Sequence, residues 1–218
     1  REVLWQDPQR SQSPIWQHGG IPIAWPWFGR IGFGDESIHG FAWKTVFFVK
    51  SRKADELVLE LSTKSAFLEY TIRLTRTLSL SMRTVNKSGS PLPVGMAFHP
   101  YFCVGERDRA VVEGYTTTPF PCINSMDKSV HFGKVEKWKE YVIRDAVLHR
   151  ALRITVENSS GVNLWNPGPE KDCPGEISGD EWRRFIALEP FLMGANRFAV
   201  LQPNEEIVFT MSVGEDLE

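Results

Sequence analysis

The chain of 218 residues is poor in cysteine and has no long apolar run. Its three cysteines, Cys103, Cys122 and Cys173, are odd in number and lack the spacing of a metal site, which favours ordinary thiols in a reducing compartment. No stretch approaches the roughly 20 apolar residues that cross a bilayer, so we expect no membrane span. The 25 Lys and Arg residues are scattered and balanced by 27 Asp and Glu, which argues against binding to nucleic acid.

Helical patterning is also missing from the sequence. No segment of roughly 12 residues or more repeats its apolar residues at the helical period. Apolar and polar residues instead alternate in three runs, at 72–82, 152–156 and 207–213, as half-buried strands do. Four other stretches have the composition of strands, namely 43–49, 56–61, 162–165 and 185–188.

Turn-forming residues separate the expected strands, at 86–91, 158–161 and 167–169. Many short strands with Gly and Pro between them predict an all-β fold, an antiparallel sandwich or barrel-like sandwich. The sequence shows no internal repeat, low-complexity tract or linker. We therefore expect a single domain over residues 1–218.

Aromatic residues are abundant, with 14 Phe, 8 Trp and 4 Tyr. Such side chains suit the half-buried surface of a sheet, and they also stack on the apolar faces of sugar rings. Core packing and sugar binding are both open interpretations of these residues.

Five segments have compositions too specific for an ordinary strand or loop. Each combines glycine, proline or aromatic residues with a histidine, an asparagine or a carboxylate. Taken singly, each polar residue is also explained as a buried hydrogen-bonding group or a solvated turn residue. The segments are 19–29 (Gly-Gly-Ile-Pro to Phe-Gly), 39–42 (His-Gly-Phe-Ala, opening a strand), 98–102 (Phe-His-Pro-Tyr-Phe), 164–167 (Leu-Trp-Asn-Pro) and 187–190 (Ala-Leu-Glu-Pro, at the end of a strand).

In this order and spacing, the five segments resemble the hexose-6-phosphate 1-epimerase branch of the aldose 1-epimerase family. That branch carries Arg-Gly-Gly-Ile-Pro, Gln-His-Gly-Phe-Ala-Arg, His-Thr-Tyr-Phe, Trp-Asn-Pro and Val-Glu-Pro. The resemblance runs from about residue 2 to residue 213 and implies an antiparallel galactose mutarotase-like β-sandwich (supersandwich). Because family members usually have further strands upstream, it also implies an N-terminally truncated chain.

The family interconverts the two anomers of a sugar, which requires its ring to open and close. A base removes the proton of the C1 hydroxyl while an acid protonates the ring oxygen, and no metal or organic cofactor is needed. By resemblance, Glu189 is the base and His99 the acid. The resemblance also implies that the substrate pocket contains His18, His39, Trp43, Trp165 and Asn166. Trp25 or Trp27 could also lie under the sugar ring. For each of these residues, core packing is the alternative interpretation.

The expected binding residues depart from the family pattern. The family Arg before Gly-Gly-Ile-Pro is His18 here, the Gln before His-Gly-Phe-Ala is Ile38, and the Arg after it is Trp43. An acidic residue of the family has no clear match: Trp138 takes its place if Tyr141 aligns, with Glu136 and Glu140 nearby.

These departures weaken the case for a phosphorylated substrate. Arginine binds phosphate through paired charge-assisted hydrogen bonds, each worth roughly 1.5–3 kcal/mol, so losing two arginines costs about two to four decades of affinity. Lys44 is a nearby cation.

Three functions follow from this mixture of retained and lost residues. The first is a divergent, non-catalytic mutarotase fold that serves as an assembly subunit, similar to the mutarotase-like subunits of the chloroplast NAD(P)H dehydrogenase-like complex at the thylakoid. It predicts protein partners bound through a large exposed aromatic patch. The second is an active epimerase of an aldose or hexose 6-phosphate, in the cytoplasm, and the third is a carbohydrate-binding module.

Overall fold

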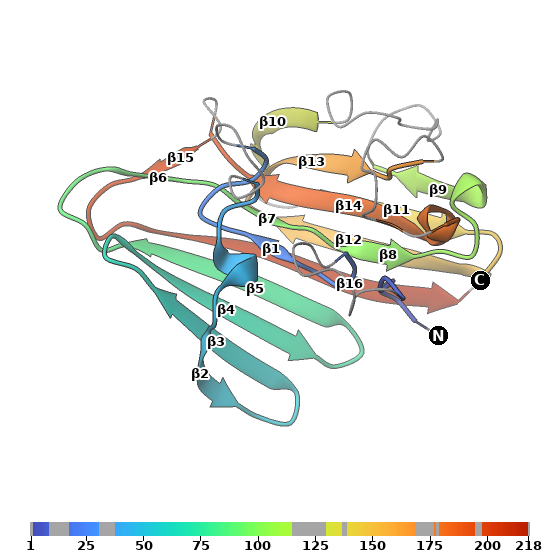
Figure 1. The fold of residues 1–218 in the computed structure, drawn as a ribbon, viewed down its shortest axis with the longest axis horizontal. Coiled ribbons are helices and arrows are strands. Elements are labelled where there is room, and N and C mark those ends of the chain that lie inside the picture. Colours follow the sequence, from blue (N-terminus) through green and yellow to red (C-terminus); the bar gives the residue numbers. More distant parts are fainter. Residues whose placement is uncertain are drawn as a thin grey trace.

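The computed structural model describes residues 2–8, 18–30, 38–114, 130–136, 139–168, 177, 179–194 and 198–217, with the backbone alone for 130–136 and 217. Two antiparallel sheets dominate it (Figure 1). The described helices are three short 3-10 turns, η3 (Ala42–Lys44), η4 (Arg107–Arg109) and η5 (Glu181–Arg184). No helix in these ranges is long and apolar enough to cross a membrane.

The larger sheet has eight strands in the order β2-β3-β4-β5-β16-β12-β11-β9. All its pairs are antiparallel, and its members are β2 (Phe48–Arg52), β3 (Glu56–Ser62), β4 (Ala66–Leu74), β5 (Leu78–Asn86), β9 (Ala110–Glu113), β11 (Lys139–Asp145), β12 (Arg150–Glu157) and β16 (Glu206–Leu217). In Figure 1, β2, β3 and β4 extend to one side, away from β13 and β14 of the other sheet.

The smaller sheet has six strands in the order β1-β7-β14-β13-β10, and β8 also pairs with β14. Its members are β1 (Ile23–Ala24), β7 (Met96–Phe98), β8 (Tyr101–Cys103), β10 (Val130–Glu136), β13 (Ser159–Trp165) and β14 (Phe185–Leu192). A separate ribbon joins β6 (Leu92–Val94) to β15 (Ala199–Leu201).

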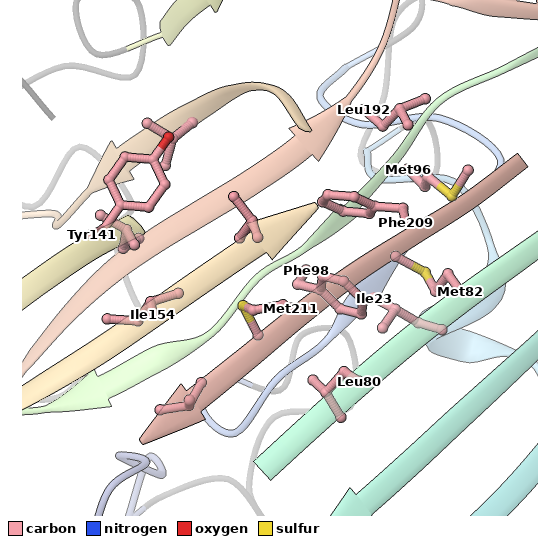
Figure 2. Packing of buried hydrophobic residues seen from close by; sticks show 14 of the residues in the cluster. Ile23, Leu80, Met82, Met96, Phe98, Tyr141, Ile154, Leu192, Phe209 and Met211 are labelled. Carbon is pink, nitrogen blue, oxygen red and sulfur yellow. The ribbon is translucent and has the colours of Figure 1, made fainter. Parts of the chain in front are cut away.

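The core lies between the two sheets (Figure 2). Phe98 of the smaller sheet stacks on Phe209 of the larger one, with ring centroids 4.9 Å apart. Met82, Met211 and Ile154 of the larger sheet are each fully buried in the same cluster. The predicted all-β antiparallel sandwich is therefore confirmed.

The alternating runs form strands as predicted, with one refinement. Residues 72–82 belong to two strands, because residues 75–77 form a turn between the end of β4 and the start of β5. Leu74 pairs with Leu78 across this turn, so the apolar parity continues from one strand into the next. Leu74 lies at the turn and is 64% exposed, whereas Met82, deeper in the sheet, is fully buried.

The prediction of a strand over 43–49, opened by His39-Gly40-Phe41-Ala42, is wrong in its first half. Residues 42–44 form η3, and a strand begins only at Phe48. The Thr45 hydroxyl donates to the Phe41 carbonyl at 2.7 Å, and the Trp43 indole donates to the Gly40 carbonyl at 3.2 Å. These side chains satisfy carbonyls locally that a strand would offer to a neighbour.

Candidate functional site

His99 and Glu189 are brought together by strand register. β14 pairs with β7 at Phe191 and Ala97, and with β8 at Ala187 and Tyr101. The position opposite Glu189 in this register is His99, in the break between β7 and β8.

The two side chains meet across this break. His99 Nε2 lies 3.4 Å from Glu189 Oε1. Glu189 was expected at the end of a strand, but β14 continues through Pro190 to Leu192, which makes the carboxyl an interior residue of the sheet, 1% exposed. The backbone N–H of His99 donates to the Pro22 carbonyl at 2.9 Å and fixes the residue to the Gly-Gly-Ile-Pro segment.

Burial changes the protonation of both groups. Desolvation raises the pKa of Glu189 to about 8, against a smaller lowering effect of its hydrogen bond from Asn163. Desolvation, and then the nearby His39 and His18, hold the pKa of His99 well below its usual value. Near pH 7 the pair is therefore neutral and holds one proton that the two groups can exchange.

His39 stands at right angles to His99, with ring centroids 5.3 Å apart. Its Nδ1 accepts from the backbone N–H of Gly29 at 3.1 Å, so the neutral ring carries its proton on Nε2. Burial, and then the charge of Arg30, lower the pKa of His39 to about 4. This ring is a neutral donor at physiological pH.

The turn that presents His39 depends on Gly40. Gly40 has a φ of 70°, and a Cβ there would lie 2.1 Å from the Trp25 carbonyl oxygen. That same oxygen accepts from the backbone N–H of Phe41 at 2.9 Å. Only glycine allows this close approach, which explains its place after the histidine.

His18 approaches the site through Tyr101. The Tyr101 hydroxyl and His18 Nδ1 are hydrogen-bonded at 2.8 Å. The Tyr101 ring stacks on His99, with ring centroids 4.9 Å apart and planes 18° apart. Both His18 and Tyr101 are 3% exposed, so they form a buried support beside His99.

A cavity of about 600 Å³ opens beside the histidines. His99, His39 and Tyr101 line one part of it, and Trp43 and Lys44 of η3 line another. Trp43 thus borders the cavity and leaves room for a sugar ring. Glu189 is not among the described lining residues, but its Oε1 lies 3.4 Å from Nε2 of His99, which is one of them.

The cavity lining carries a positive charge. Lys44 lies over the Trp43 ring, 5.4 Å from its centroid. Among the described residues that line the cavity there is no aspartate or glutamate. An anionic substituent on a ligand would therefore meet a cation and no carboxylate here.

Asn166 and Trp165 lie apart from the described lining of this cavity. The Asn166 amide donates to the carbonyls of Trp182 and Phe185 at 2.7 and 2.9 Å, and its oxygen accepts from the N–H of Gly168 at 2.9 Å. We therefore assign Asn166 a structural role, in which its amide links the end of β13 to η5 and the start of β14. Trp165 touches the site from the side, with its ring centroid 6.2 Å from that of His99 and 6.1 Å from that of His18.

Two further tryptophans occupy the core or its edge. Trp25 is fully buried and donates to the Thr84 hydroxyl at 3.0 Å. Trp27 packs edge-on against Phe41, with centroids 6.1 Å apart. Core packing is the better interpretation of Trp25, whereas Trp27 is half-buried and is absent from the described lining of the cavity.

Of the four residues expected near the missing acidic position, Tyr141 and Glu140 have described side chains, and neither lines the cavity. Tyr141 is buried in the core, and Glu140 forms an ion pair with Arg153 at 2.6 Å. Trp138 and the side chain of Glu136 lie outside the described part of the structure.

Asn163 is the site residue that the sequence alone did not reveal. It pairs with Glu189 across β13 and β14, and its Nδ2 donates to Glu189 Oε2 at 3.0 Å. One feature of the sequence pointed to it: Asn163 lies on an apolar strand, two residues before Trp165. A buried amide on such a strand needs a hydrogen-bond partner. The sequence could not show which strand provides that partner.

Solved structures define the class of fold. A structure described as a "putative mutarotase" from Salmonella typhimurium matches with a TM-score of 0.78 at 20% identity and covers 100% of this chain and 81% of that one. A galactose mutarotase related enzyme from Lactobacillus acidophilus matches with a TM-score of 0.71 at 16% identity, over 99% of this chain and 87% of that one. The fold is therefore galactose mutarotase-like, as predicted.

The sequence comparisons define the family. The family model for aldose 1-epimerase matches residues 15–214, so the chain belongs to the aldose 1-epimerase family. A Salmonella typhimurium protein named "Putative glucose-6-phosphate 1-epimerase" is 23% identical over 98% of this chain and 81% of its own length. An Escherichia coli protein of the same name is 25% identical over 86% of this chain and 72% of its own length.

These findings favour the enzyme interpretation over the assembly interpretation. The family is described as aldose 1-epimerase and both relatives are named "Putative glucose-6-phosphate 1-epimerase", and nothing in them indicates a subunit of the chloroplast dehydrogenase complex or a chloroplast location. The predicted resemblance to the hexose-6-phosphate 1-epimerase branch is confirmed.

Proposed function

We propose that the protein is an aldose 1-epimerase that interconverts sugar anomers with His99 and Glu189. The observation that carries the proposal is the contact of 3.4 Å between Glu189 Oε1 and His99 Nε2, beside a cavity of about 600 Å³. Both reacting oxygens of a cyclic aldose are bonded to C1, so two catalytic groups in direct contact can serve them together.

The proposed reaction begins with a proton shift within the pair. Glu189 passes its proton to His99, which gives a carboxylate and an imidazolium without any change in total charge. The carboxylate then takes the proton of the C1 hydroxyl, and the imidazolium gives its proton to the ring oxygen. The bond between C1 and the ring oxygen breaks while the C1 carbonyl forms.

Ring closure reverses these roles. Rotation about the bond between C1 and C2 presents the other face of the aldehyde to the hydroxyl that closes the ring. His99 then removes the proton of that hydroxyl and Glu189 returns a proton to the carbonyl oxygen, which leaves an imidazolium and a carboxylate. Transfer of the proton from His99 back to Glu189 restores the neutral starting state. In this scheme His39, with its proton on Nε2, donates to a sugar hydroxyl near His99; its ring contact with His99 supports this role.

A phosphorylated hexose is one candidate substrate. The relatives are named for glucose 6-phosphate, and Lys44 supplies a cation at the cavity. A neutral aldose is the other candidate, because Trp43 stands where the branch carries an arginine. Stacking of a sugar ring against Trp43 would suit either one.

The test is a coupled mutarotation assay with glucose, galactose and glucose 6-phosphate. We expect the protein to accelerate at least one of the three reactions, and we expect His99→Gln to lose that acceleration. A well-folded wild-type protein without effect on any of these sugars would contradict the proposal.

Assembly with a protein partner is a second candidate, favoured by one surface. Val46, Phe48 and Val49, at or beside the terminal strand β2, are 87%, 79% and 62% exposed. Phe48 is the one aromatic side chain among the strongly exposed large hydrophobic residues of the described ranges, so the expected aromatic patch is small. A Phe48→Ser variant that loses a stable partner in co-purification, while mutarotation is absent from the wild type, would favour this function.

A further inference from the structure

We infer that Asn163 is a positioning residue for the Glu189 carboxyl, which it holds by one oxygen so that the other faces His99. This inference rests on the proposed epimerase function. Asn163 itself reaches the pair through Glu189, so it is not a catalytic residue in its own right.

The two carboxyl oxygens have different neighbours: one accepts a hydrogen bond, and the other lies close to a histidine. Asn163 Nδ2, from β13, donates to Oε2 at 3.0 Å. His99 Nε2, from the opposite side of β14, lies 3.4 Å from Oε1. With Oε2 held, the plane of the carboxyl is fixed and Oε1 is the oxygen left to act as the base.

Strand register makes this arrangement stable. Asn163 and Glu189 are direct partners in the β13–β14 ladder, and the ladder continues from Gly161–Phe191 to Trp165–Ala187. Side chains of direct partners lie on the same face of a sheet at close range. Asn163 is 8% exposed and Glu189 is 1% exposed, so water competes little for the bond.

The choice of an amide has a chemical consequence. An amide N–H stabilises a carboxylate by donating to it and carries no charge that would trap the carboxylate permanently in its ionised form. An arginine or lysine in this place would lower the pKa of Glu189 far below neutrality and remove the shared proton. The amide of Asn163 instead favours the ionic state of the pair only slightly.

The other titratable groups around the pair are basic or neutral. His39, from the turn before η3, and His18, from the segment before Gly19, face His99, and Arg30 acts on His39. The Tyr101 ring stacks on the His99 ring. Among the effects described for Glu189, the bond from Asn163 is the one that favours the ionised carboxyl.

The experiment compares Asn163→Leu, which removes the donor at similar size, with the wild type. We expect kcat to fall and the alkaline limb of the pH profile to move up by about one pH unit, since two or three such hydrogen bonds lower a carboxyl pKa by about two units. KM should change little, because Asn163 is absent from the described lining of the cavity. An alkaline limb that stays in place in a folded variant would overturn the inference.

Asn166→Leu is the matched control. It removes another buried amide near the end of the same strand, but one that binds only backbone groups in the described structure. We expect lower thermal stability and an unchanged pH limb. If both variants moved the limb equally, the effect would be one of general loosening, and the inference would fail.

A second measurement separates this inference from the proposed function. The pKa of Glu189 can be followed directly, by infrared or carbon NMR titration of labelled glutamate, with Glu189→Gln to assign the signal. A raised pKa in Asn163→Leu, in a protein without mutarotase activity, would support the positioning role and refute the proposed function. An unchanged pKa would refute the positioning role whatever the activity.

Asn163→Asp is the alternative test variant if Asn163→Leu does not fold. It keeps the shape of the side chain but sets a second carboxyl beside Glu189, and two such groups share a proton. We expect a larger upward shift of the same limb and of the Glu189 titration. A downward shift of either would contradict the inference.

Discussion

The centre of the candidate site and its mouth are built in different ways. At the centre, Glu189 and its neighbours sit on strands whose register fixes each side chain, and Glu189 is 1% exposed. At the mouth, Trp43 and Lys44 lie on a single 3-10 turn, and Lys44 is exposed. His99 and Glu189 at the first place match the residues that the family resemblance implies, whereas Trp43 at the second stands where the resemblance implies an arginine.

This difference shows where the fold constrains change. A substitution inside a buried ladder disturbs partners on both neighbouring strands, whereas a residue on a surface turn is replaced with little cost. The same scaffold can therefore keep the pair proposed for acid–base chemistry while the residues that would contact the substrate change. We expect chemistry to depend on the centre and substrate preference to depend on the mouth.

The largest expected effect is on turnover, at the centre. Glu189→Gln removes the base and should lower kcat by about 10²–10⁴, the usual contribution of a general acid or base. Trp43→Ala, at the mouth, should act mainly on KM. The coupled mutarotation assay measures both variants, and a Trp43→Ala enzyme as inactive as Glu189→Gln would remove the distinction between the two regions.

The next effect concerns stability beside the centre. Asn166→Ala leaves the carbonyls of Trp182 and Phe185 without their donor and should cost about 2 kcal/mol of unfolding free energy. Chemical denaturation measures this loss. Because Asn166 is assigned here to structure alone, KM for the sugar should stay the same at temperatures where the variant is folded. A raised KM would instead indicate that Asn166 contributes to substrate binding.

The mouth is tested by removing its cation. Lys44→Gln should raise KM for glucose 6-phosphate about tenfold, since one charge-assisted hydrogen bond is lost, and leave KM for glucose unchanged. Initial rates with the two sugars, at constant ionic strength, provide the comparison. Equal effects on both sugars would show that Lys44 acts on the shape of the turn.

The pH dependence sharpens the description of the centre. The pair must hold one proton to supply the acid, and Glu189, whose pKa is raised to about 8, loses that proton as the pH rises. Activity should therefore be level near neutrality and fall about tenfold per pH unit above pH 8. Rates from pH 6 to pH 10 test this limb.

Stability should follow the same ionisation. Because the pKa of Glu189 is higher in the folded protein than its ordinary value of 4.5, the folded state binds this proton more tightly than the unfolded state. Its contribution to stability is complete below the unfolded value and is lost as the pH rises through about 8. Glu189→Gln should remove this part of the pH dependence, as thermal unfolding at pH 5 and pH 9 would show.

Much of the fold was readable from local patterns. The alternation at 207–213 predicted β16, because polar and apolar neighbours in a strand face opposite sides of the sheet. The strand expected at 43–49 failed, since the bonds from Thr45 and Trp43 back to Phe41 and Gly40 are local side-chain contacts that an apolar pattern does not reveal. Burial of Trp25 against Thr84, 59 residues apart in sequence, was equally invisible.

The sequence by itself determined the class of fold, the family resemblance and the two residues proposed for acid–base chemistry, since strand alternation and short motifs are properties of neighbouring residues. Only the tertiary structure decided that Asn163 supports Glu189, that Asn166 binds backbone, and that Trp43 borders a cavity. Each of these facts depends on the register between strands distant in sequence or on the volume between packed segments. The contact between His99 and Glu189 is of this second kind, because 90 residues separate them along the chain and one sheet brings them to 3.4 Å.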